Sequence, residues 1–259
     1  MKFISKIIIA AMLICCLGAF ASCTTPEETG GELALELSHD GDYYMVIGIG
    51  THKGKEVVIP SEYDGIPVKM IDNCAFENCT EIEKVTVPEG VEYMGNFAFG
   101  GCTALKEIVI PSTVKKLNDG MFSGCTALVS VTLPDSITEM GQSIFAGCTA
   151  LKNVKLPANI KAIPGQMFKG CTALETVTVP EGVEKIQTFS FSGCTALYEI
   201  IIPASVTRIE FRTFEACSSL VSIEFGGKTS DWNAIQKSPM WNIGTGDYTV
   251  YCSNGELAQ

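Results

Sequence analysis

Residues 122–145 read FSGCTALVSVTLPDSITEMGQSIF, and the pattern of these residues returns every 23 positions along the chain. The shared unit is FxGCTALxxVxLPxxVxxI. Cysteines keep the period at Cys79, Cys102, Cys125, Cys148, Cys171, Cys194 and Cys217. Phenylalanines keep it three residues earlier, at Phe76, Phe99, Phe122, Phe145, Phe168, Phe191 and Phe214. A fixed period of this length predicts a solenoid, in which each repeat forms one coil that packs against its neighbours.

The unit also predicts how one coil is built. Apolar and polar residues alternate in residues 131–133, which predicts a short strand, and Pro134 ends it because proline has no N–H to continue a ladder. The VxxI segment predicts a second short extended stretch. Phe122, Cys125 and Leu128 recur at a spacing that suits a helical turn. We therefore expect an α/β repeat solenoid with short parallel strands and a helical turn in each 23-residue coil. Seven such coils, stacked about 4.8 Å apart, would form a rod of roughly 35 Å.

The repeat and its flanks resemble the BspA-like, treponemal-type leucine-rich repeat family from about residue 33 to 259. Residues 42–50 (DYYMVIGIG) and 59–68 (IPSEYDGIPV) are similar to that family's entry hairpin. Residues 231–235 (DWNAI) and 248–252 (YTVYC) resemble the segment that commonly closes its arrays. The resemblance implies display at a bacterial cell surface and adhesion to host proteins or other cells. It implies no catalytic residues and transfers no binding residue to this chain.

The N-terminus is predicted to be a lipoprotein-type export signal. Two lysines precede an apolar run at residues 7–17, which is too short to span a bilayer comfortably. Residues 20–23 (FASC) resemble a lipobox in which Phe20 stands where the family usually has leucine. We expect cleavage before Cys23 and lipid attachment to Cys23. The alternative is an ordinary secretory signal that is cut near Ala21.

These observations divide the chain into five predicted segments. They are a signal peptide at 1–22, a tether at 23–32, an N-terminal capping hairpin at 33–55, the solenoid at 56–225 and a C-terminal cap at 226–259. The polar composition of residues 24–31 (TTPEETGG) is typical of a tether. We expect an exported monomer that its lipid holds at the cell surface or outer membrane. Without the lipid, the protein would be secreted.

Charge and cysteine spacing limit the partners and cofactors. The formal net charge is −11, which repels a phosphate backbone, so no nucleic-acid partner is expected. Cysteines 23 residues apart lack the close spacing of a metal site, and no metal or other cofactor is expected. In parallel coils their side chains would point inward side by side, so a column of buried thiols is favoured over disulfides.

Catalytic motifs are sparse. The only histidines, His39 and His52, precede the repeats and have no triad or metal-ligand neighbourhood. Acidic residues such as Glu89, Asp135 and Glu181 directly follow the strand-closing prolines, which places them in solvated turns. A glycan-active enzyme therefore stays a minor alternative. Trp232 and Trp241 lie in the closing segment, which favours a role in capping the core over stacking on a sugar.

The outward positions of the predicted strands form the candidate binding site. One side chain per coil lies between two buried strand residues, and we call this set the outer strip. It consists of Thr86, Val109, Thr132, Lys155, Thr178, Ile201 and Glu224. Its predicted flank consists of Lys84, Glu107, Ser130, Asn153, Thr176, Glu199 and Ser222. A mixed, weakly charged face of this kind suits an extracellular protein or glycan. The alternatives are that this face is plain solvated β surface, or that the protein is a structural scaffold of the cell envelope.

Overall fold

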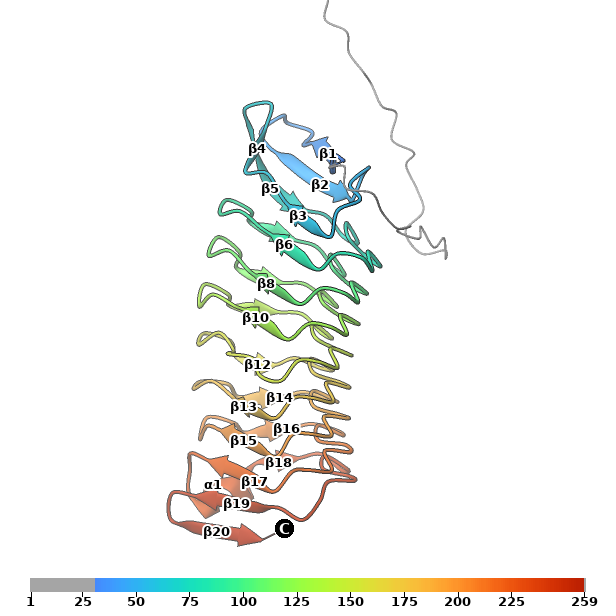
Figure 1. Cartoon of the computed structure of the whole chain (residues 1–259). Coiled ribbons are helices and arrows are strands. Elements are labelled where there is room, and N and C mark those ends of the chain that lie inside the picture. The colour runs from blue at the N-terminus through green and yellow to red at the C-terminus, as the bar shows by residue number, and fades with distance from the viewer. Residues whose placement is uncertain (1–30, 259) are drawn as a thin grey trace, which may run out of the picture.

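A computed structural model describes residues 31–258 of the chain. The described chain winds into an elongated solenoid whose coils stack along one axis (Figure 1). The predicted signal peptide, the lipid-attachment residue Cys23 and most of the predicted tether lie outside the described residues.

The first strand of each coil joins a parallel arrangement that we call the first ladder. It consists of β3 (Glu56–Val58), β6 (Lys84–Thr86), β8 (Glu107–Val109), β10 (Ser130–Thr132), β13 (Thr176–Thr178), β15 (Glu199–Ile202), β17 (Ser222–Phe225) and β19 (Thr249–Cys252). The register is one repeat, so Val131 lies beside Ile108 and both side chains are buried. The alternation of apolar and polar residues sets this orientation, because successive strand residues face opposite sides.

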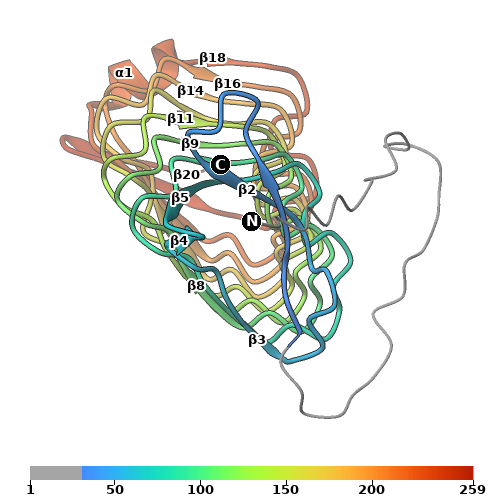
Figure 2. The same ribbon diagram turned by 90° about the horizontal axis from the view of Figure 1, so that it is seen from above.

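The VxxI segments build the second ladder. It consists of β5 (Ile66–Ile71), β7 (Tyr93–Met94), β9 (Lys116–Leu117), β11 (Glu139–Met140), β12 (Ala162–Ile163), β14 (Lys185–Ile186), β16 (Arg208–Ile209) and β18 (Gln236–Lys237). Figure 2 shows β9, β11, β14, β16 and β18 on one side of the coil and β3 and β8 on the other. The two ladders therefore present two separate outer surfaces.

The prediction of a helical turn in each coil is wrong. Its place is taken by successive turns: Cys102 N donates to Phe99 O at 3.2 Å and Leu105 N to Cys102 O at 3.1 Å. Other N–H groups bond to the next coil, as Phe99 N does to Met121 O at 3.0 Å. Gly101 has φ of +71°, a left-handed conformation that no α-helix contains. Stacked coils thus supply the partners that a helix would find within itself, and the described residues hold one α-helix, α1 (Thr229–Ala234).

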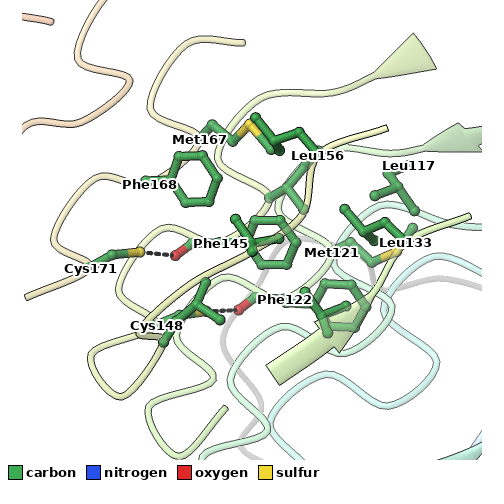
Figure 3. Close-up of a cluster of buried hydrophobic side chains, with 14 of the residues drawn as sticks. Leu117, Met121, Phe122, Leu133, Phe145, Cys148, Leu156, Met167, Phe168 and Cys171 are labelled. Atoms are coloured by element: carbon green, nitrogen blue, oxygen red, sulfur yellow. Dashed lines mark hydrogen bonds between the residues drawn. The ribbon is translucent and has the colours of Figure 1, made fainter. Parts of the chain in front are cut away.

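Phenylalanines and cysteines form two buried columns, as predicted. The Phe145 ring stacks on Phe122 and Phe168 with centroids 5.7 and 5.6 Å apart (Figure 3). The thiol of Cys148 donates to Phe122 O at 3.1 Å, and the same contact repeats from Cys102 to Cys217. Burial raises the pKa of the Cys125, Cys171 and Cys217 thiols to about 12. These cysteines are therefore protonated donors in the core.

Each end of the solenoid is covered by elements outside the repeat. At the N-terminal end, β1 (Ala34–Leu37) and β2 (Tyr44–Gly48) form an antiparallel pair, and β2 lies parallel to β5. β4 (Glu62–Tyr63) pairs with the start of β5. At the C-terminal end, β20 (Gly255–Ala258) runs antiparallel to β19. Trp232 is buried and its ring lies 6.1 Å from that of Trp241, so both tryptophans cap the core as predicted.

The prediction of a strand at residues 153–155 is wrong, because residues 151–157 form no strand. Asn153 and Lys155 are residue types that strands disfavour, and Val154 alone is β-branched. In the same coil Pro164 has no N–H, whereas the equivalent Gln187 donates to Ile163 O at 3.0 Å. Within the described residues, neither ladder therefore pairs the coil of β10 and β11 with the coil of β12. We call this interface the seam.

Candidate binding surfaces

Six of the seven outer-strip residues lie on strands of the first ladder, and Lys155 does not. Val109 lies beside Thr132, Thr178 beside Ile201 and Ile201 beside Glu224. Lys155 is exposed and its Nζ lies 3.8 Å from Asp135 Oδ2. The structure thus brings the strip together on either side of residues 151–157, where the first ladder is interrupted.

A second outward row, which the strand pattern missed, runs beside the strip. Its members follow the leucine of each CTAL motif or its equivalent, and we call them the edge row: Glu83, Lys106, Val129, Lys152, Glu175, Tyr198 and Val221. Each lies just before its strand, so the alternation of strand residues does not extend to it. The 23-residue spacing counted from the buried leucine would have identified the row.

The N-terminal part of this face is charged. Glu83 bonds to Lys55 Nζ at 2.7 Å and to Lys106 Nζ at 2.5 Å. Hydrogen bonds from Lys106 and Lys55 lower the pKa of Glu83 to about 2. The first ladder therefore starts with a compact ion-pair network in which one carboxylate joins three successive coils.

The C-terminal part of the same face carries four exposed apolar side chains. Tyr198, Ile201, Val221 and Tyr251 each keep between 41% and 57% of their surface exposed, and we call them the terminal patch. Val221 N donates to Tyr198 O at 3.0 Å, which places these two residues on adjacent coils. Glu224 pairs with Ile201 on one side and Tyr251 on the other. Several exposed apolar side chains on neighbouring coils distinguish this area from scattered surface residues.

A groove of about 620 Å³ lies over the second ladder at the seam. Its rim and walls are largely polar: Asn96, Lys116, Asn118, Asp119, Thr138, Glu139, Gln142, Lys161 and Gln187. Its remaining lining is Met140, Gly141, Ile160, Ala162 and Pro164. The volume falls within the range of small-molecule binding sites. Sequence reasoning missed the groove, because it arises where the repeat loses long side chains in successive coils.

The residues considered for catalysis do not converge. Glu89, Asp135 and Glu181 are exposed, which confirms their placement in solvated turns. Glu89 Oε1 accepts from Ser112 N at 3.2 Å, so this carboxylate joins two coils. Among residues 31–258, no group of three or more His, Cys, Asp or Glu side chains is placed to hold a metal ion. Across this same range no helix combines the length and hydropathy needed to cross a membrane.

Comparisons with known proteins agree with this architecture. The model of the BspA-type leucine-rich repeat region matches residues 69–197 and 141–243, with 6 copies of the repeat. A leucine-rich repeat protein of T. pallidum is 30% identical over 73% of this chain and 87% of its own, with a TM-score of 0.65. No match was found among curated protein sequences.

Two further solved structures share the fold. A leucine-rich repeat protein from Bacteroides ovatus is 23% identical over 84% of this chain and 70% of its own, with a TM-score of 0.55. Another from Eubacterium ventriosum is 22% identical over 78% of this chain and 63% of its own, with a TM-score of 0.60. At these identities the likeness concerns the path of the backbone alone.

Proposed function

The chain belongs to the BspA-type leucine-rich repeat family, and from this premise we propose that it is a non-catalytic, adhesin-like binding protein displayed at the cell surface. The terminal patch is the observation that carries the proposal. Four exposed apolar side chains lie on adjacent coils, and water leaves such surface readily when a complementary partner covers it. The partner is an extended protein segment whose apolar side chains contact Tyr198, Ile201 and Tyr251.

The charges of the first ladder support an extended partner over a compact one. The ion-pair network at Glu83 and the terminal patch lie at opposite ends of the first ladder, on either side of its interruption at residues 151–157. A segment that lies along the first ladder would contact charged side chains at the N-terminal end and apolar side chains at the C-terminal end. Ion pairs near water contribute little affinity, so the terminal patch supplies most of the binding free energy and the polar part supplies orientation.

A binding assay tests this proposal. The wild-type solenoid and the variant Tyr198→Ser/Ile201→Thr/Val221→Ser/Tyr251→Ser would be titrated against immobilised extracellular-matrix proteins and mucin. We expect the variant to lose about tenfold or more in affinity for the partner that the wild type binds. The matched control is Val58→Thr/Val109→Thr, which replaces exposed valines at the other end of the ladder. Absence of any partner above background, or undiminished binding by the patch variant, would refute the proposal.

Anchoring through Cys23 is the second part of the proposed function, and it rests on the FASC motif and the polar residues that follow it. A single acyl chain binds membranes only marginally, whereas several chains on one cysteine hold a protein stably. We expect Cys23→Ala to move the protein from the membrane fraction to the soluble fraction without changing its circular dichroism. Sedimentation of the variant with membranes in high salt would contradict the lipid anchor.

The alternative role as an envelope scaffold makes a different prediction in living cells. Crosslinking should then capture proteins of the same envelope, and the Tyr198→Ser/Ile201→Thr/Val221→Ser/Tyr251→Ser variant should lose them. An adhesin should instead show loss of attachment to foreign surfaces with its envelope contacts unchanged.

A further inference from the structure

The groove at the seam exists because three residues of neighbouring coils, at two repeat positions, are less bulky than their equivalents. Ala162 stands where the adjacent coils have Glu139 and Lys185, so the second ladder lacks one long outward side chain. Gly141 and Pro164 follow β11 and β12 at the position that Gln187 occupies after β14. Met140 is partly exposed as a result, although the equivalent Leu117 and Ile163 are buried. The hollow thus has an apolar floor.

The polar groups around this floor are held by bonds between coils. Asn96 Oδ1 accepts from Asp119 N at 3.0 Å, and Asp119 Oδ1 accepts from Gln142 N at 2.7 Å. Gln187 Oε1 accepts from Gly165 N at 3.0 Å. Because their carbonyl oxygens are already engaged, Asn96 and Gln187 keep the two N–H donors of their amide groups for a ligand. Side chains fixed in this way lose little conformational freedom on binding.

One buried amide adds an acceptor. Asn118 Nδ2 donates to Met94 O at 2.7 Å, and this side chain is 7% exposed. The bond assigns the nitrogen to the interior and leaves Asn118 Oδ1 as an acceptor. The groove therefore combines amide donors, an amide acceptor and the Asp119 carboxylate, which bonds between coils hold in place.

The charges in the groove balance. Two cations, Lys116 and Lys161, face two anions, Asp119 and Glu139, and Lys116 Nζ lies 3.6 Å from Glu139 Oε2. A charged ligand gains nothing from a balanced site, and the net charge of −11 disfavours a polyanion. A neutral ligand with many hydroxyl groups, each of which donates and accepts, matches this lining.

We propose that the seam groove binds a neutral oligosaccharide. The polar lining hydrogen-bonds to sugar hydroxyl groups, and Met140, Ala162 and Pro164 contact the apolar face of a sugar ring. The groove is lined by residues on and beside the strands of the second ladder, whereas the terminal patch lies on and beside strands of the first ladder. It is therefore independent of the proposed protein partner, and one activity can be lost while the other remains.

Filling the groove tests the proposal. In Ala162→Lys the new side chain occupies the hollow, and the fold tolerates lysine there because Lys116 and Lys185 hold the equivalent position in other coils. The probes are cellohexaose, xylohexaose and mannohexaose, with hexagalacturonate as the charged comparison, titrated by isothermal calorimetry. We expect the wild type to bind at least one neutral hexasaccharide and Ala162→Lys to lose about tenfold or more in affinity. Gln142→Ala, which removes a polar wall, should weaken binding to a smaller extent.

The control for the added charge is Ser61→Lys, at an exposed position outside the groove and the outer strip, which should bind the sugar as the wild type does. Failure of all three neutral probes, binding of hexagalacturonate alone, or equal affinity in wild type and Ala162→Lys would overturn the proposal. The patch variant Tyr198→Ser/Ile201→Thr/Val221→Ser/Tyr251→Ser should keep its sugar binding. Failure of the oligosaccharide proposal and failure of the adhesin proposal therefore give different experimental results.

Discussion

The buried cysteines are hydrogen-bond donors as well as apolar residues. Cys148 donates to Phe122 O, and burial raises its pKa well above the ordinary value, so the thiol stays protonated at neutral pH. We expect Cys148→Ala to lower the free energy of unfolding by about 1–3 kcal/mol, because it removes this bond and opens a small cavity. Urea denaturation measures the change. Cys252→Ala, at a less buried position in the cap, is the control, and equal losses in both variants would contradict the role of the column.

Glu83 makes a prediction about pH at the same scale. Hydrogen bonds from Lys106 and Lys55 lower its pKa from 4.5 to about 2. The folded state therefore binds the proton more weakly than the unfolded state, so this contribution to stability is complete above about pH 4.5 and is lost as the pH falls toward 2. We expect NMR titration to show a Glu83 carboxyl pKa near 2 that rises in Lys106→Met. An unchanged value in that variant would mean that Lys106 is not the main cause.

At the scale of elements, the seam is the weakest connection between coils. The phenylalanine stack and turn bonds such as Phe122 N to Ile144 O, at 2.9 Å, cross it without strand pairing. We expect Phe145→Ala to remove about 3–5 kcal/mol and to divide thermal unfolding into two transitions, because coupling between neighbouring coils makes a solenoid cooperative. Phe191→Ala, which lies between paired coils, should destabilise to a similar extent but keep one transition. Calorimetry distinguishes the two, and a single transition in both variants would refute the weakness of the seam.

At the scale of the whole molecule, the caps decide whether the solenoid stays in solution as single particles. Truncation after Phe225 would uncover the apolar surface that Trp232, Trp241 and Val250 cover. We expect this variant to associate or aggregate, which light scattering after size-exclusion chromatography would detect.

The matched control removes a complete repeat and keeps both caps. Deletion of residues 171–193 takes out 23 residues, so the next coil can replace the missing one in register. This variant should elute as one species of lower mass. Aggregation of the internal deletion to the same extent as the truncation would show that repeat number, rather than capping, controls solubility.

The amino-acid sequence alone determined the repeat, the inward columns of Phe and Cys, and the strands at most first-ladder positions. These features follow from spacing within one unit, since alternation and period specify which side chains face inward. Trp232 and Trp241 were placed in the cap for a similar reason, because a solenoid must cover its last apolar face. The outer strip could be listed residue by residue, since its positions are the outward counterparts of buried ones.

Other features depend on contacts with the neighbouring coil and are seen only in the folded protein. The turn at Phe99 is not helical because its N–H finds Met121 O in the next coil, and that preference is invisible within one repeat. The seam forms because one coil loses pairing to the preceding coil in both ladders. Asn153 and Lys155 disfavour its strand in the first ladder, and Pro164 lacks the N–H that would donate in the second. The terminal patch and the groove arise only when residues 23 positions apart become adjacent, so that Val221 joins Tyr198 and Ala162 leaves a hollow between Glu139 and Lys185. The residue pattern within one repeat determines which side chains face the core of each coil. The stacking of coils determines which outer surfaces are available for binding.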